Sequence, residues 1–175
     1  YPYLIYHSVR QEGLVVIHTH KGAVVVSLTV EDAIDIFEAR LALEPFILKK
    51  AIERATEVDV AHVQRALEDY TKALKSKESP AKLSELNWSF HKALSRSARR
   101  PRSLALLSSL YTSADRYLRL QIDARSAQAK ALEDHQALAA AFADGNPALA
   151  QKLLKQQIAD ARDDVITGLP ARLDV

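Results

Sequence analysis

Four polar side chains that can bind a ligand or a metal ion fall at positions expected to be buried: Asn87, His91, His135 and Gln157. Neutral imidazoles bind zinc, nickel and similar ions, and carboxamides both donate and accept hydrogen bonds. Burying such a group without a partner costs roughly 1–3 kcal/mol. We therefore predict that the four groups share a polar cavity that holds a small ligand, a metal ion, or both.

The helical spacing of the surrounding apolar residues places all four groups on inward faces. Asn87 and His91 are one turn apart, on the side of Leu83, Leu86, Phe90 and Leu94. His135 lies 10 residues before Gly145 and Gln157 lies 12 residues after it. With a rise of 1.5 Å per residue, both lie about 15–18 Å from that turn. Two helices therefore bring polar groups to one depth.

Arg40 is a further candidate, because it lies within the apolar stripe of the first long helix. Glu44 follows one turn later and can pair with it. An ordinary surface ion pair is one interpretation. If Arg40 faces inward instead, its guanidinium suits a small carboxylate.

Capping signals and prolines define the helices that must position these residues. Thr29 with Asp32, and Thr56 with Asp59, resemble capping boxes, while Pro80, Pro101 and Pro147 favour first helical positions. Short connections make sequential helices antiparallel neighbours. We expect an all-α antiparallel bundle of about six helices, at about 29–51, 56–75, 79–97, 101–122, 126–143 and 147–167.

The N-terminal segment is predicted to differ from the bundle. Two β-branched runs within residues 14–27 flank a polar loop that contains Gly22, which is typical of a β-hairpin. Residues 6–13 resemble the end of a helix stopped by Gly13. Since the chain does not begin with Met, we expect the segment before the bundle to be truncated.

Composition restricts the possible classes of protein. The 175 residues include no Cys, which excludes disulfides and thiolate metal sites. The net charge of +2 neither requires nor excludes nucleic acid. We find no apolar stretch near the roughly 18 residues needed to span a bilayer, and no signal-peptide pattern. We expect no membrane partner and a cytoplasmic location.

Three segments together resemble a known family. The hairpin and first helix read EGLVVIHTHKGAVVVSLTVEDAIDIFEARLALEP, and LNWSFHKAL and EDHQALAAAFADGNPALAQKLLKQQI follow in order. They are similar to the wing, linker and helical blocks of GntR-superfamily transcriptional regulators, in the FadR-like branch with an FCD effector-binding domain. The resemblance covers roughly residues 8–167. It implies a wing remnant at 1–28, an effector-binding and dimerisation domain at 29–170, and a tail at 171–175.

The resemblance also implies partners and site residues. Such a regulator is a homodimer that binds operator DNA and a small carboxylate metabolite, here through Arg40, Asn87, His91, His135 and Gln157. Many relatives hold a divalent metal with one Asp and three His. Asn87 and Gln157 stand at two of those four positions, so zinc or nickel at Asn87, His91 and His135 is one of two alternatives. The predicted DNA contacts are His18, Thr19, His20, Lys21 and Gly22.

Two other classes of protein were weighed. A metal-dependent bundle oxidase needs paired Glu-x-x-His motifs and several inward carboxylates. The nearest feature here, Asp59 with His62, is better explained as a cap and a surface residue, and no nucleophile elbow is present. A pure dimerisation module would not need inward histidines. We therefore expect a ligand-responsive regulator and not an enzyme.

Overall fold

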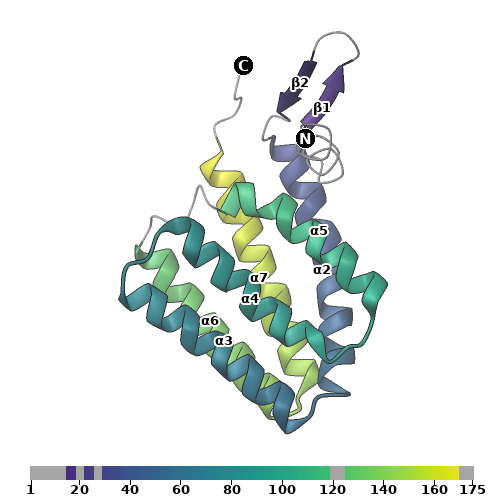
Figure 1. The fold of residues 1–175 in the computed structure, drawn as a ribbon, viewed down its shortest axis with the longest axis vertical. Coiled ribbons are helices and arrows are strands. Elements are labelled where there is room, and N and C mark those ends of the chain that lie inside the picture. Colours follow the sequence, from purple (N-terminus) through teal and green to yellow (C-terminus); the bar gives the residue numbers. More distant parts are fainter. Residues whose placement is uncertain (1–14, 19–21, 26–28, 119–124, 170–175) are drawn as a thin grey trace, which may run out of the picture.

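The computed structural model describes residues 15–18, 22–25, 29–118 and 125–169, and its described part contains six helices and two short strands (Figure 1). The predicted all-helical bundle is confirmed. The predicted helix end at residues 6–13, and the part of the fourth helix beyond Leu118, fall outside the described residues. The helices are α2 (Val30–Ile52), α3 (Glu57–Lys75), α4 (Pro80–Arg96), α5 (Pro101–Leu118), α6 (Arg125–Ala143) and α7 (Pro147–Gly168).

Side-chain caps fix the helix starts where the sequence predicted them. The Thr29 hydroxyl accepts from the backbone N–H of Asp32 over 3.1 Å. Thr56 and Asp59 form a reciprocal capping box at the start of α3. Gly145 adopts the left-handed conformation, with φ of 63°, that ends α6 and leads directly into the Asn146 cap of α7. These local signals explain why the predicted boundaries are close to the observed ones.

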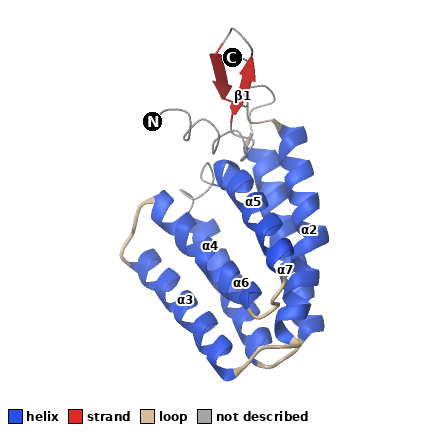
Figure 2. Cartoon of the chain, turned by 45° about the vertical axis from the view of Figure 1, so that its right-hand side comes forward, coloured by secondary structure: helices blue, strands red, loops and turns tan. Residues whose placement is uncertain are grey.

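The helices form two groups that meet along the middle of the molecule. In Figures 1 and 2, α2 lies beside α7 and α5, while α3 lies beside α4 and α6. Contacts between α6 and α7, and between α2 and α4, join the groups. The core between them contains aromatic and aliphatic side chains such as Phe37, Ile47, Phe90, Leu138 and Phe142.

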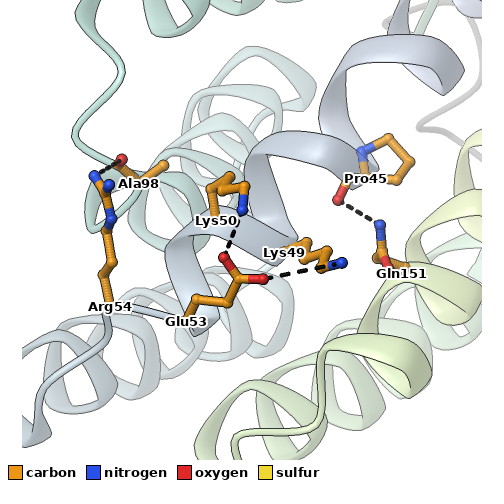
Figure 3. A network of polar contacts seen from close by, with 7 residues as sticks. All are labelled: Pro45, Lys49, Lys50, Glu53, Arg54, Ala98 and Gln151. Atoms are coloured by element: carbon orange, nitrogen blue, oxygen red, sulfur yellow. Dashed lines mark hydrogen bonds and ion pairs between the residues drawn. The ribbon is translucent and has the colours of Figure 1, made fainter.

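Helix α2 is the longest element, and polar contacts hold its second half in place (Figure 3). Pro45 lies inside the helix, where it cannot donate a backbone hydrogen bond. The carbonyl of Pro45 accepts from Nε2 of Gln151 on α7 over 3.0 Å. After the helix ends, Nη1 of Arg54 donates to the carbonyl of Ala98 over 3.0 Å. These contacts connect α2 to both groups of helices.

Two short strands precede α2. The strands β1 (Val15–His18) and β2 (Gly22–Val25) pair antiparallel, with Val15 opposite Val25 and His18 opposite Gly22. Figure 1 draws them beyond the end of the bundle at which α2 begins. Among the described helices, none combines the length and hydropathy that a membrane span requires.

Candidate functional site

A cavity of about 170 Å³ lies inside the bundle, lined by residues from all six described helices. At roughly 10–15 Å³ per water-sized atom, it has room for a ligand of about 11–17 non-hydrogen atoms. All five predicted effector-binding residues line it: Arg40 from α2, Asn87 and His91 from α4, His135 from α6 and Gln157 from α7. The other lining residues are Tyr70, Leu83, Ser84, Leu118, Gln128, Lys130, Ala131, Asp134, Ile158, Asp160, Ala161 and Asp164.

The two histidines meet at the inner end of the cavity. His91 is 5% exposed and His135 is 1% exposed, and their ring centroids are 5.4 Å apart in an edge-to-face arrangement. The His135 ring also packs against Phe90 at 4.6 Å and Tyr70 at 4.8 Å. Among the described residues, none hydrogen bonds to either nitrogen of His135. A buried imidazole with no partner for its donor or its acceptor indicates a site for a bound molecule.

Burial keeps both rings uncharged near neutral pH. It lowers the pKa of His135 to about 3. It also lowers the pKa of His91 well below its usual value, with further contributions from neighbouring His135 and Arg40. A neutral imidazole has one N–H donor and one acceptor nitrogen. The pair can therefore hydrogen bond to a polar ligand without adding charge to the cavity.

Arg40 faces inward, so the surface-pair interpretation is wrong. Its Nε donates to Oε1 of Glu44 over 2.6 Å, and the two residues are only 4% and 3% exposed. Its guanidinium also lies over the rings of Tyr111, at 4.4 Å, and Phe37, at 5.1 Å. Burial alone lowers the pKa of Arg40, but Glu44 and Tyr111 more than offset this and leave that pKa above its usual value. Arg40 is therefore charged at any physiological pH.

One guanidinium nitrogen of Arg40 is left for a ligand. Oε2 of Glu44 accepts from the Tyr111 hydroxyl over 2.9 Å, so both oxygens of Glu44 have partners. Nη1 of Arg40 is buried, and no hydrogen-bond acceptor for it lies in the described part of the chain. Because Arg40 lines the cavity, an anionic or carbonyl oxygen of a ligand could accept from this atom.

The two carboxamides lie on opposite sides of the cavity and are each half-buried. Oε1 of Gln157 is buried without a donor among the described residues, which adds an unused acceptor to the unused donor of Arg40. The structure thus brings together Arg40, Asn87, His91, His135 and Gln157, as the sequence predicted.

Charged residues at the outer part of the cavity were not predicted. Nζ of Lys130 donates to Oδ2 of Asp134 over 2.9 Å and to Oδ2 of Asp160 over 2.7 Å, which links α6 to α7. These hydrogen bonds raise the pKa of Lys130 well above its usual value. The spacing contained a signal for this surface, because Asp160 and Asp164 follow Gln157 on one face of α7.

The residues present do not fit a resident divalent metal. Three protein ligands are usual even in open zinc sites, and the cavity has only two imidazoles, supplemented by neutral amides. Within the described residues, no group of three or more His, Cys, Asp or Glu side chains is arranged to hold an ion. We derive no role for zinc or nickel from this arrangement.

The predicted DNA-contacting residues lie mostly beyond what the structure describes. His18 ends β1, Gly22 begins β2, and the backbones of these two residues pair. Thr19, His20 and Lys21 lie outside the described residues. The Asp59 and His62 pair is resolved as the sequence indicated. Asp59 caps α3, and His62 is an exposed residue whose Nε2 lies 3.2 Å from Nη1 of Arg96.

Comparisons with known proteins agree on one family and one fold. Residues 35–160 match the FCD domain family. A curated relative from Bacillus subtilis (strain 168), the uncharacterized HTH-type transcriptional regulator YdhC, is 27% identical over 85 residues. That match spans 49% of this chain and 38% of the relative.

Solved structures of GntR proteins share the fold. A putative GntR transcriptional regulator from Rhodococcus sp. RHA1 superposes with a TM-score of 0.80 at 20% identity, covering 94% of this chain and 78% of that one. A GntR-family regulator from Pseudomonas syringae pv. tomato str. DC3000 gives 0.66 at 22% identity, over 93% and 67% of the two chains. McbR/YncC of E. coli gives 0.76 at 18% identity, over 90% and 81%.

Proposed function

Because this chain belongs to the FCD domain family of GntR-superfamily regulators, we propose that it is the effector-binding part of a DNA-binding transcriptional regulator. The proposal divides the chain into a wing remnant at residues 1–28, an effector-binding and dimerisation domain at 29–170, and a tail at 171–175. It rests on the family match, on the names of the relatives and on the ligand-ready cavity. As a regulator of DNA it would act in the cytoplasm.

The effector we propose is a small organic carboxylate, and the proposal is supported by one observation about unpaired polar groups. Arg40 and His135 line the cavity, and Nη1 of Arg40 and both ring nitrogens of His135 are buried with no partner among the described residues. Leaving such groups unpaired costs roughly 1–3 kcal/mol each. A carboxylate could accept from Arg40 and from an imidazole N–H, which would recover that cost. Asn87 and Gln157 would then hold the remaining polar atoms of the ligand.

Helix α2 is the element through which the cavity could control DNA binding. It carries Arg40 and directly follows the segment that contains β2. An effector that pulls on Arg40 would bias the position of α2 and so the orientation of the wing. Only about 1.4 kcal/mol of coupling changes operator affinity tenfold.

The wing loop is the proposed DNA contact. His18, Thr19, His20, Lys21 and Gly22 would touch the phosphate backbone or the minor groove, which gives salt-dependent affinity and little sequence choice. A homodimer would present two such loops to a pseudo-palindromic operator. Loss of salt-dependent binding to duplex DNA on Lys21→Ala would support this contact, and unchanged binding would contradict it.

Exposed apolar side chains on α2 and α5 support the homodimer. Phe46 is 48% exposed and Leu106 is 62% exposed. The two helices are antiparallel, because the Tyr117 hydroxyl near the end of α5 donates to Oδ2 of Asp32 near the start of α2, over 2.6 Å. Phe46 and Leu106 therefore lie toward the same end of the bundle, on neighbouring helices.

The only tryptophan of the chain provides the test of effector binding. Trp88 stacks on Tyr111 with ring centroids 4.1 Å apart. The Tyr111 hydroxyl donates to Glu44, the ion-pair partner of Arg40. We expect titration with straight-chain carboxylates up to octanoate to change Trp88 fluorescence saturably in the full chain. The double variant Arg40→Met/Glu44→Met should lose the response, while the exposed His62→Ala should keep it. A response independent of Arg40, or none at all, would overturn the carboxylate assignment.

A further inference from the structure

The inner and outer parts of the cavity differ in charge, and this restricts the ligand further. Building on the proposed function, we infer that the effector is zwitterionic: a carboxylate that reaches Arg40, an aliphatic middle, and an ammonium group at the outer end near Asp164. The inference depends on the charged groups around the cavity and on their separation along α7.

The inner part contains the guanidinium of Arg40, but its charged groups sum to zero and would not neutralise a bound anion. Arg40 is already paired with Glu44, at 2.6 Å, and His91 and His135 are neutral. Nη1 of Arg40 still provides a directed donor for a carboxylate oxygen. The negative charge of a bound carboxylate would therefore not be neutralised at this end of the cavity.

The outer part carries an excess of negative charge. Among the described residues that line this part, Lys130 is the single cation, and it bonds to both Asp134 and Asp160. Asp164 also lines the cavity, is exposed, and forms no hydrogen bond or ion pair within the described part of the chain. Counting Glu44 as the partner of Arg40, the described residues at the cavity include two cations and four carboxylates. A ligand with only a carboxylate would add to this excess, whereas an ammonium group would reduce it.

The spacing of residues on α7 sets the separation of the two ligand charges. Gln157 and Asp164 both line the cavity and are seven residues apart, which is about 10 Å along the helix axis. Two apolar side chains on α7 between these levels, Ile158 and Ala161, line the cavity, together with Leu83 and Leu118 from other helices. An aliphatic chain between a carboxylate and an ammonium group would match this order of polar, apolar and acidic surface.

The test compares three probes of equal chain length: 8-aminooctanoate, octanoate and octanedioate. Affinities for the full chain are measured by Trp88 fluorescence and by calorimetry at low ionic strength. We expect 8-aminooctanoate to bind about fivefold more tightly than octanoate, the order of one partly solvated charge pair. Octanedioate should bind most weakly. Raising the salt concentration should reduce the preference, because exposed charges are screened.

Two neighbouring aspartates provide a matched pair of variants. Asp164→Asn should remove the preference for the amine while leaving the affinity for octanoate unchanged or higher. Asp163→Asn should change neither, because Asp163 pairs with Arg162 and does not line the cavity. Both residues are exposed on α7, so both variants should fold.

The possible outcomes distinguish failure of the zwitterion inference from failure of the carboxylate proposal. If octanoate binds through Arg40 as tightly as 8-aminooctanoate, the zwitterion inference is overturned and the carboxylate proposal stands. The same holds if Asp164→Asn keeps the preference for the amine. If no probe binds, or if binding does not depend on Arg40, both the inference and the carboxylate proposal fail.

Discussion

Arg40 and Glu44 form an ion pair inside the bundle, with 2.6 Å between Nε and Oε1, one helical turn apart on α2. The second oxygen of Glu44 accepts from Tyr111 on α5. Glu44 thereby binds the guanidinium of Arg40, which lines the cavity. The Nη1 atom of Arg40 stays buried without a partner among the described residues. The pair serves both the stability of the fold and the presentation of a donor.

Breaking this ion pair should lower the stability of the fold, and replacing both partners should restore it. Arg40→Met leaves Glu44 buried without its cation, so we expect the free energy of unfolding to fall by about 3–5 kcal/mol. Arg40→Met/Glu44→Met replaces the pair with apolar groups and should recover most of that loss. Urea denaturation measures both effects. Equal stability of Arg40→Met and the wild type would show that the pair is not buried as described.

The two neutral histidines should make stability depend on pH. Their pKa values in the folded chain lie below the usual 6.5, so below pH 6.5 the unfolded chain binds more protons than the folded one. Stability is then fully present above pH 6.5 and falls as the pH decreases. From pH 7.5 to 5.5 each histidine should lower the free energy of unfolding by about 1.4 kcal/mol.

Histidine variants assign that pH dependence to the cavity. We expect His135→Leu to remove about half of the loss between pH 7.5 and 5.5, as measured by urea denaturation at each pH. The exposed His62→Ala should leave the loss intact. A wild-type stability that does not change over this range would mean that the rings are charged or solvated in the folded chain.

The exposed apolar surface on α2 and α5 predicts which residues would hold the proposed homodimer together. We expect Phe46→Glu or Leu106→Glu to shift the mass measured by light scattering from dimer to monomer, because each places a charge at an apolar contact. Val58→Glu is the control, since Val58 is 64% exposed but lies on α3 and not on α2 or α5. A dimer that survives both changes places the interface elsewhere.

Metal content decides between the two alternatives left by the sequence. The donor set around His91 and His135 contains no carboxylate or third imidazole in ligating position among the described residues. We therefore expect zinc and nickel far below one ion per chain after dialysis, with ligand binding unchanged by a chelator. A stoichiometric ion that is lost in His91→Ala and His135→Ala would restore the metal assignment at Asn87, His91 and His135.

The sequence predicted most of the helical fold because its signals are local. Thr29 and Thr56 cap the helices they were expected to cap, Pro80 begins α4 as expected, and Gly145 ends α6. The inward polar residues were also predictable, since helical spacing relates each of them to an apolar stripe. These inferences require no knowledge of which helices are neighbours.

Contacts between helices were not predictable in the same way. The partnership of Glu44 with Tyr111 joins residues 67 positions apart, and that of Lys130 with Asp160 joins residues 30 positions apart. The separation of these residues along the sequence does not indicate that they are in contact. The role of Asp164 was missed because its surroundings depend on how α6 and α7 pack.

The most direct test of the effector site is a crystal structure of the full chain grown with octanoate. We predict the carboxylate inside the bundle, with one oxygen within hydrogen-bond distance of Nη1 of Arg40 and the ligand in contact with His135. Octanoate bound elsewhere, or a cavity that holds only ordered water at saturating ligand, would contradict the assignment of this cavity as the effector site.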